Sequence, residues 1–185
     1  ALGTGVLNAL TDGQLVAFAT DDIAALTTTQ FSGLGVSTIA TFSTDQVVAL
    51  TTGQVAAMST LQLNALTSAQ LNSLSSDNLA ALTNAQVLAL SANQLLTLST
   101  DQYARMGTAA IAAISSAQIS YLTTAAIAAL TTDQIVVLST AALNAMNSAQ
   151  IGAIENSDVI LLTTGQLANL KTAQIALLTS CLLYT

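Results

Sequence analysis

The chain has 185 residues, of which 52% are apolar and only 6% are charged, with a formal net charge of −7. Two basic residues cannot make the positive surface that a phosphate backbone requires, so we expect no nucleic-acid partner. Histidine is absent, which excludes Ser/His/Asp and Cys/His catalytic centres. Polar residues recur too often to leave the roughly 18 consecutive apolar residues of a membrane-spanning helix, so we expect no membrane insertion.

An eight-residue repeat runs through the chain without insertion or deletion. From residue 10 to 178, every eighth residue is Leu, Ile, Met or Phe, and from 15 to 175 every eighth residue is Leu, Ile, Val, Phe or Tyr. The residue before each of the latter is Gln in 14 of 21 octads; these positions, 14, 22 and onward to 174, are called the glutamine column. A period held this strictly predicts one continuous repeat domain over residues 1–185.

The octad at residues 50–58 shows what each unit encodes. Ser or Thr followed three residues later by Gln is a capping box, in which Thr51 and Gln54 would exchange hydrogen bonds at a helix start. Leu50 before the cap and Val55 within the helix form the matching hydrophobic staple. The next cap arrives eight residues later, and a cap residue is not helical, so each helix would be only about six residues long.

Two other structures compete with short helices. In one long helix the apolar pair would drift about 80° around the axis per octad, which gives no fixed stripe. A β-solenoid is the stronger rival, because an even period keeps the faces of each strand in register. Alanine pairs such as 56–57 and 112–113 favour helix over strand. The sequence therefore predicts an all-α solenoid of short capped helices, one per octad, with the β-solenoid as alternative.

In chain order, residues 1–10 form a degenerate octad, and residues 33–38 lack both the cap and the Gln, with glycines that suggest a looser turn. Residues 43–106 are close to ideal, with Asn78 the one replacement in the glutamine column. From Gly107 onward, alanine replaces every other Gln, at Ala110, Ala126 and Ala142. That 16-residue alternation suggests two octads per coil, whereas small residues at 32, 56, 80 and onward to 176 suggest a 24-residue period.

The acidic residues are candidate metal ligands. One set shares a column in the first helical turn, where carboxylates complement the helix dipole: Asp45, Asp77, Asp101 and Asp133. The densest cluster, Asp12 with Asp21 and Asp22, has fewer carboxylates than a calcium loop needs. We therefore predict no metal site, no catalytic residue, no cofactor and no small-molecule substrate, and hence not an enzyme.

The sequence also predicts the surroundings of three other side chains. Tyr103 falls in an apolar column and should lie in the core, whereas Tyr121 should lie on the surface. Cys181 is the only thiol, so it cannot form a disulfide within the chain. It is expected to be a small buried hydrophobe, with a bridge to another chain as the alternative.

A column of threonines gives the one candidate binding feature. These residues follow the cap and would form a regular row, as in ice-binding solenoids: Thr44, Thr52, Thr60, Thr100, Thr108, Thr124, Thr132 and Thr140. The alternative is that Thr at a first helical position is simply solvated. The row keeps a binding module for ice, glycan or a surface as the second functional hypothesis.

One octad, residues 130–138 (LTTDQIVVL), resembles the opening helix of TAL effector repeats. The resemblance covers about nine residues that share a capping box. The base-reading loop and the basic character of that family are missing, so DNA binding is not carried over.

Across its whole length, the chain resembles the octapeptide tracts of LTTAQIAAL type in large bacterial surface and secreted proteins. The resemblance implies a structural or adhesive role outside the cell and supplies no functional residues. We therefore expect an extracellular or cell-surface rod, stalk or self-assembling fibre.

The apolar columns continue to both ends of the sequence, through Leu2, Leu7 and Leu10 at one end and Leu178 and Leu183 at the other. A solenoid whose last coils keep an apolar edge associates with copies of itself or continues into more repeats. This pattern predicts self-association, either head-to-tail or side by side.

Overall fold

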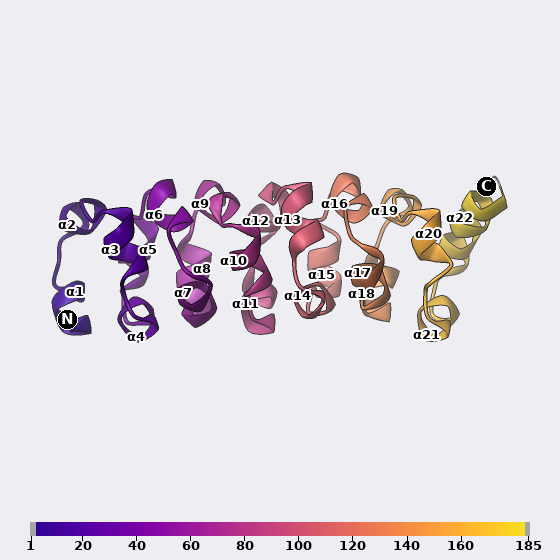
Figure 1. Ribbon diagram of the computed structural model, residues 1–185. Helices are drawn as coiled ribbons and strands as arrows, with labels where there is room; N and C mark the ends of the chain where they lie inside the picture. Colours follow the sequence, from indigo (N-terminus) through magenta and orange to yellow (C-terminus); the bar gives the residue numbers. More distant parts are fainter. Residues whose placement is uncertain (1–2, 184–185) are drawn as a thin grey trace. The chain divides into compact units, whose positions relative to one another are not determined.

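The computed structural model describes residues 3–183, without the side chains of residues 4, 8, 12 and 179–183. Within that range the chain forms 22 short α-helices and no strand (Figure 1). The prediction of an all-α repeat fold with one helix per octad is confirmed, and the β-solenoid alternative is wrong. Leu2, and the side chains of Cys181 and Leu183, lie outside the described part of the chain.

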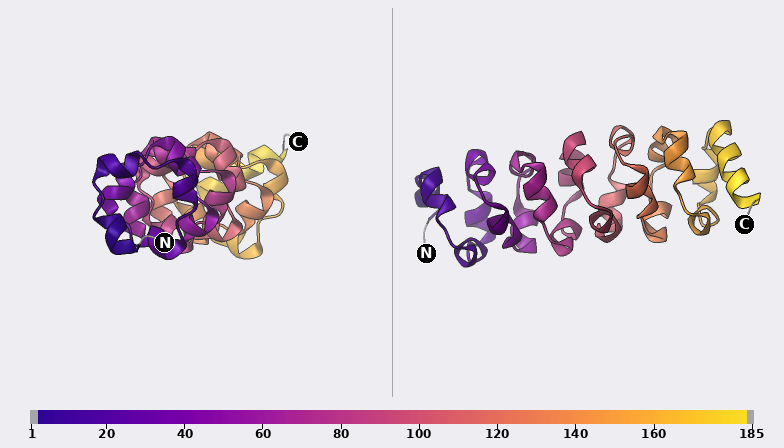
Figure 2. Two further views of the ribbon diagram at one scale, coloured as in Figure 1. Left: turned by 60° about the vertical axis from the view of Figure 1, so that its left-hand side comes forward. Right: turned by 90° about the horizontal axis from the view of Figure 1, so that it is seen from above.

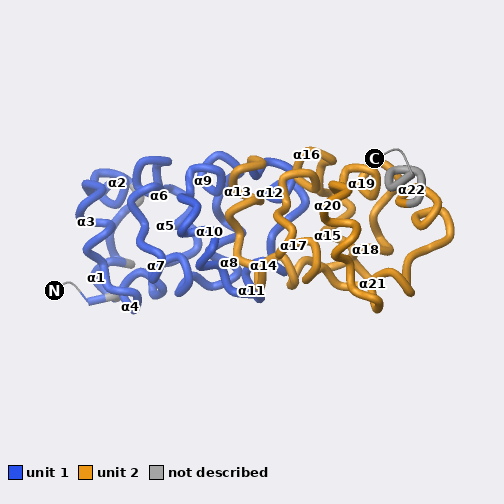
Figure 3. Tube along the Cα trace, turned by 45° about the vertical axis from the view of Figure 1, so that its right-hand side comes forward, with its two compact units in different colours: residues 1–98 blue, residues 99–185 orange. Residues whose placement is uncertain are grey.

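The helices form two compact units, residues 1–98 and 99–185, each described by itself (Figure 3). The prediction of one continuous domain over 1–185 stays a prediction. The helices of unit 1 are α1 (Thr4–Asn8), α2 (Asp12–Val16), α3 (Thr20–Ala24), α4 (Thr28–Ser32), α5 (Val36–Ala40), α6 (Thr44–Val48), α7 (Thr52–Ala57), α8 (Thr60–Ala65), α9 (Ser68–Ser73), α10 (Ser76–Ala80), α11 (Asn84–Ala89) and α12 (Ala92–Thr97).

Unit 2 continues the same succession of helices. They are α13 (Thr100–Arg105), α14 (Thr108–Ala112), α15 (Ser116–Ile119), α16 (Thr124–Ala128), α17 (Thr132–Val136), α18 (Thr140–Ala145), α19 (Ser148–Gly152), α20 (Asn156–Val159), α21 (Thr164–Ala168) and α22 (Thr172–Leu183). All are four to six residues long except α22, which has twelve.

The helices are short because the capping residues interrupt them. Thr51 has extended backbone angles, φ −78° and ψ 156°, so the helix of the preceding octad cannot continue through it. The Thr51 hydroxyl instead faces the first turn of the next helix. The Gln54 N–H donates to Thr51 Oγ1 at 3.2 Å, and the Thr51 N–H donates to Gln54 Oε1 at 2.9 Å. The same reciprocal pair forms at Thr11, Thr27, Ser43, Ser59, Thr67, Thr83, Ser91, Ser99, Ser115, Asn147 and Thr163.

The degenerate octad at residues 33–38 keeps the same path. Gly35 occupies the cap position with φ −64° and ψ 150°, close to the angles of the Thr and Ser caps, and α5 follows it directly. No residue in the described range has a positive φ. The expected looser turn is therefore wrong, and the octad is an ordinary repeat that has lost its capping side chains.

Within each unit the helices wind into coils, and most helices pack on the helix three octads away, as α4 packs on α7, and α15 on α18 (Figures 1 and 2). Three octads are 24 residues, so the small residues at 32, 56 and 80 belong to one stack of helices, α4, α7 and α10. The 16-residue alternation has no counterpart in this packing, and two octads per coil is wrong.

The core of each unit consists of the two apolar columns. Within one octad Leu63 is fully buried and Leu66 nearly so, and the same pair of positions is filled by Val55 and Met58 one octad earlier. Tyr103 takes the place of an aliphatic residue and is buried as predicted. A six-residue helix is too short to be stable alone in water, so burial of these columns between coils is what holds the helices.

Candidate functional site

The glutamine column lies at the junction between successive coils. In α7, Oε1 of Gln54 accepts from its own cap, while Nε2 of the same side chain donates to the carbonyl oxygens of Ile23 and Leu26, both at 2.8 Å. Ile23 lies in α3, four octads earlier, so one amide completes a helix start and closes the end of a helix in the preceding coil. The two functions use the two different atoms of the amide.

The same clamp repeats along both units, always to carbonyls 28–31 residues earlier. We define the amide clamp as this Nε2 donation. In unit 1 it is made by Gln46, Gln54, Gln62, Gln70, Gln86 and Gln94. Within unit 2 it is made by Gln134, Gln150, Gln166 and Gln174.

The clamp shows how the coil closes. Helix α7 packs on α4, three octads back, yet its Gln54 reaches the end of α3, four octads back. One turn of the coil therefore takes more than three and fewer than four octads. Residues one octad apart lie on different sides of a coil, and residues about three octads apart lie above one another.

An amide suits this position because it both accepts and donates hydrogen bonds. The last carbonyls of a helix have no partner within the helix, and buried carbonyls without a donor are costly. Gln54 is 1% exposed, so its own amide also needs partners inside the protein. The clamp satisfies both sets of groups, and its role is structural: the amide positions no reactive atom.

This second role was missed from the sequence, although a signal was present. A capping box accepts Glu as readily as Gln, yet the glutamine column contains Gln, Asn, Ala, Thr and Asp and never Glu. A carboxylate could serve the cap but has no N–H to donate to a carbonyl. Gln in 14 of 21 octads, with Glu in none, therefore indicates that most octads use a side chain that can donate as well as cap.

The replacements within the column behave as their chemistry requires. Asn78 donates to the Leu50 carbonyl at 2.9 Å but, being one carbon shorter, does not form the reciprocal bond with its cap Ser75. Asp158 is 4% exposed and accepts a hydrogen bond of 2.5 Å from the Thr132 hydroxyl. Ala142 is fully buried and carries no polar group.

The acidic residues lie where the dipole argument predicted. Asp45, Asp77, Asp101 and Asp133 are all exposed in the first turns of their helices. Asp22 accepts from the Ala19 N–H at 3.3 Å and so serves as a helix cap. Among the side chains that the structure describes, no group of three or more His, Cys, Asp or Glu residues is placed to hold a metal ion.

The threonine column does not form one row, because consecutive octads lie on different sides of a coil. Thr52 and Thr60 begin α7 and α8, which belong to different stacks of helices. Two stacks in each unit do carry a run of hydroxyls at the first helical residue. In unit 1 these are Thr28, Thr52 and Ser76 on α4, α7 and α10, and Thr20, Thr44 and Ser68 on α3, α6 and α9. In unit 2 they are Thr100, Thr124, Ser148 and Thr172 on α13, α16, α19 and α22, and Ser116, Thr140 and Thr164 on α15, α18 and α21.

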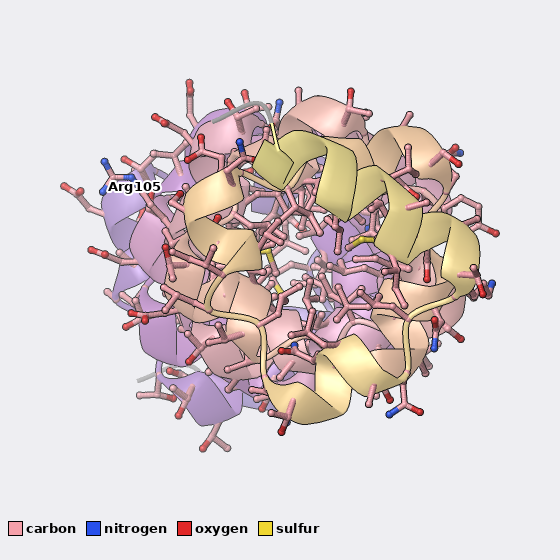
Figure 4. All side chains as sticks on the ribbon, turned by 90° about the vertical axis from the view of Figure 1, so that its right-hand side faces the viewer. Arg105 is labelled. Atoms are coloured by element: carbon pink, nitrogen blue, oxygen red, sulfur yellow. The ribbon has the colours of Figure 1, made fainter. Side chains whose placement is uncertain are left out.

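The remaining predicted residues are few. Tyr121 is exposed as predicted, and burial raises the pKa of the Tyr103 phenol far above its usual value of 10.0. Arg105 is exposed and its side chain extends away from the ribbon, as labelled in Figure 4. None of the helices in the described range is long and apolar enough to cross a membrane.

A family model for the ALTTAQ repeat matches the chain four times, over residues 28–60, 53–84, 104–132 and 127–155. These matches together cover more than half of the 185 residues. They confirm the octapeptide repeat tract inferred from the sequence. None of the curated proteins matches the chain.

Proposed function

The chain belongs to the ALTTAQ repeat family, and on that premise we propose that it is a structural protein, a self-assembling rod, stalk or fibre segment at a bacterial surface. The observation that carries the proposal is the amide clamp. The polar side chain that recurs most regularly in the repeat is buried and bonded within the fold. The octad therefore specifies a scaffold, and the chain acts without chemistry of its own.

The clamp also supports self-association. A coil offers helix-end carbonyls to the coil that follows it and glutamine amides to the coil before it, so its two sides are complementary to each other. Contacts between unlike surfaces of identical chains give open filaments when the rotation between copies does not close into a ring. Head-to-tail stacking of copies would repeat the contact that joins coils within each unit.

Side-by-side association has separate support. Unit 1 exposes large aliphatic side chains on several helices, among them Val48, Leu61, Leu88 and Leu96. Leu61 and Leu88 belong to α8 and α11, which pack on each other. With 6% charged residues in the whole chain, little electrostatic repulsion opposes contact between copies.

Sedimentation velocity at micromolar concentration, with negative-stain electron microscopy, tests the proposal. We expect a concentration-dependent series of assemblies that the microscope shows as filaments. The double change Leu61→Lys and Leu88→Lys should leave the circular dichroism spectrum intact and remove lateral bundles. Thr44→Lys together with Thr140→Lys adds the same charge at exposed threonines and is the matched control. A monomer at every concentration would contradict the proposal.

A second candidate function, binding of ice, glycan or another surface, is favoured by the hydroxyl run on α4, α7 and α10. Changing Thr28 and Thr52 to Lys should remove thermal hysteresis or ice shaping if that run binds ice. Changing Thr60 and Thr108, which lie on other stacks, is the matched control. No activity in the parent chain, or equal loss in both variants, would reject this candidate.

A further inference from the structure

Four octads of unit 2 have no side-chain amide in the glutamine column, and in two of them, those of Ala142 and Asp158, the carbonyls 28–31 residues earlier also belong to unit 2. Ala142 stands in the glutamine column of the α18 octad, where a Gln would reach the Ile111 and Ile114 carbonyls at the end of α14. A methyl group cannot donate. Asp158 stands in the α20 octad, opposite the end of α16, and its carboxylate accepts from Thr132 instead of donating.

An equivalent pair of octads in unit 1 shows what is lost. Residues 83–90 and 51–58 stand in the same relation as residues 139–146 and 107–114, with 32 residues between the two starts. In unit 1, Gln86 Nε2 donates to the Val55 and Met58 carbonyls at 2.8 and 2.9 Å. Gln86 Oε1 also accepts from the Thr83 N–H at 2.8 Å. Ala142 can make none of these three bonds, and Ser139 keeps only the bond from the Ala142 N–H to its hydroxyl.

Helix α18 has a second polar deficit. Oδ1 of Asn144 is buried without a hydrogen-bond partner, the one such side-chain atom among the described residues. An unsatisfied buried acceptor weakens the closed state relative to an opened state in which water reaches it. Asn144 lies two residues from Ala142, so both deficits act on the same helix.

We propose that unit 2 contains a built-in point of local opening, where α18 separates from the end of α14, with a second at α20 over α16. In unit 1, every octad from α6 to α12 has a side-chain amide that donates to the coil before it. These seven junctions of unit 1 therefore stay closed under conditions in which the two in unit 2 open. This inference concerns the mechanics of the fold and stands whether or not the chain assembles into fibres.

Hydrogen exchange of the full chain, read by mass spectrometry under native conditions, measures this opening. Backbone amides of residues 111–114 and 143–146 should exchange on the order of tenfold faster than those of residues 55–58 and 87–90, because the three side-chain hydrogen bonds that Gln86 makes have no counterpart at Ala142. Ala142→Gln should slow the first pair of segments by a similar factor. Ala141→Gln, on an exposed neighbour in α18, is the matched control and should change nothing there.

The reverse change creates the same opening in unit 1. Gln86→Ala should raise exchange at residues 55–58 and 87–90 toward that of the Ala142 junction, so the proposal remains testable if Ala142→Gln fails to fold. Asp158→Asn should slow exchange at residues 127–130, because an amide there can donate to Leu130 as Asn78 does to Leu50. Equal protection of the matched segments in the unchanged chain, or equal slowing by both glutamine variants of α18, would overturn the proposal.

Discussion

Gln86 and Val55 are joined across two coils: Nε2 of Gln86 donates to the Val55 carbonyl oxygen at 2.8 Å, over 31 residues of sequence. The same side chain caps its own helix through Oε1, which accepts from the Thr83 N–H. A local signal and a tertiary contact thus share one amide. Substitutions at the cap and at the glutamine separate these two roles.

Gln86→Glu should keep the cap and destroy the clamp. The free energy of unfolding should fall by about 2–4 kcal/mol at pH 7, since the Val55 and Met58 carbonyls lose the amide donor and face a buried carboxylate, and Val55 keeps only the Met58 N–H. Urea unfolding measures this loss. Gln14→Glu, at an exposed capping glutamine, is the control and should stay within about 0.5 kcal/mol of the parent.

The cost of Gln86→Glu should also depend on pH. Burial beside carbonyl oxygens raises the carboxyl pKa in the folded state above the usual value of about 4.3. A raised folded-state pKa means that stability is present below the unfolded pKa and is lost as pH rises through the folded one. The variant should therefore approach the parent near pH 4, and a cost that is flat from pH 4 to 7 would contradict a buried carboxyl.

Thr51→Ala and Gln54→Ala should differ. The first removes a cap and should cost about 1 kcal/mol. The second also removes the amide that donates to the Ile23 and Leu26 carbonyls, of which Ile23 keeps backbone donors, and should cost about 2–4 kcal/mol. Thermal and urea unfolding of both single variants measure the difference, and equal costs would mean that the clamp contributes nothing.

Asn78→Gln should stabilise unit 1. The longer side chain can accept from the Ser75 N–H, which Asn78 does not reach, while its amide keeps the Leu50 carbonyl as partner. One added hydrogen bond is worth about 0.5–1.5 kcal/mol. Gln86→Asn makes the opposite exchange and should lose a similar amount; the idea fails if both changes shift stability in the same direction.

Leu63→Ala and Leu61→Ala test the core from a single helix, α8. Leu63 is fully buried in an apolar column, so truncation should cost about 2–5 kcal/mol. Leu61 is 68% exposed and should lose less than about 0.5 kcal/mol. Comparable losses at both positions would show that Leu61 is covered in solution, as lateral assembly would require.

The helix starts could be predicted from sequence because a capping box joins residues three apart, as Thr51 and Gln54 are. The clamp could not be predicted, because which earlier carbonyl lies beside the Gln54 amide depends on how many octads complete a coil. That number is set by the angle between successive helices, which no local pattern encodes. The small residues that recur every 24 residues did indicate the stacking of α4, α7 and α10. They did not indicate which atoms form hydrogen bonds between coils.

The threonine row illustrates the same limit. A column in sequence becomes a row in space only if consecutive octads face the same side, and here they do not. Thr52 shares its stack with Thr28 instead of Thr60. The local property, exposure of a first helical residue, was predictable, whereas the arrangement of these residues relative to one another was not.

The central claim is that glutamine side chains hold the coils together. Side-chain amide hydrogen exchange of the full chain, labelled with 15N at glutamine and read by NMR, tests it directly. We predict that the amide protons of Gln54, Gln62 and Gln86 exchange at least about a hundredfold more slowly than those of exposed Gln14, because buried bonded protons exchange only on opening. Uniform exchange of all glutamine side chains at the rate of the free amino acid would contradict the claim.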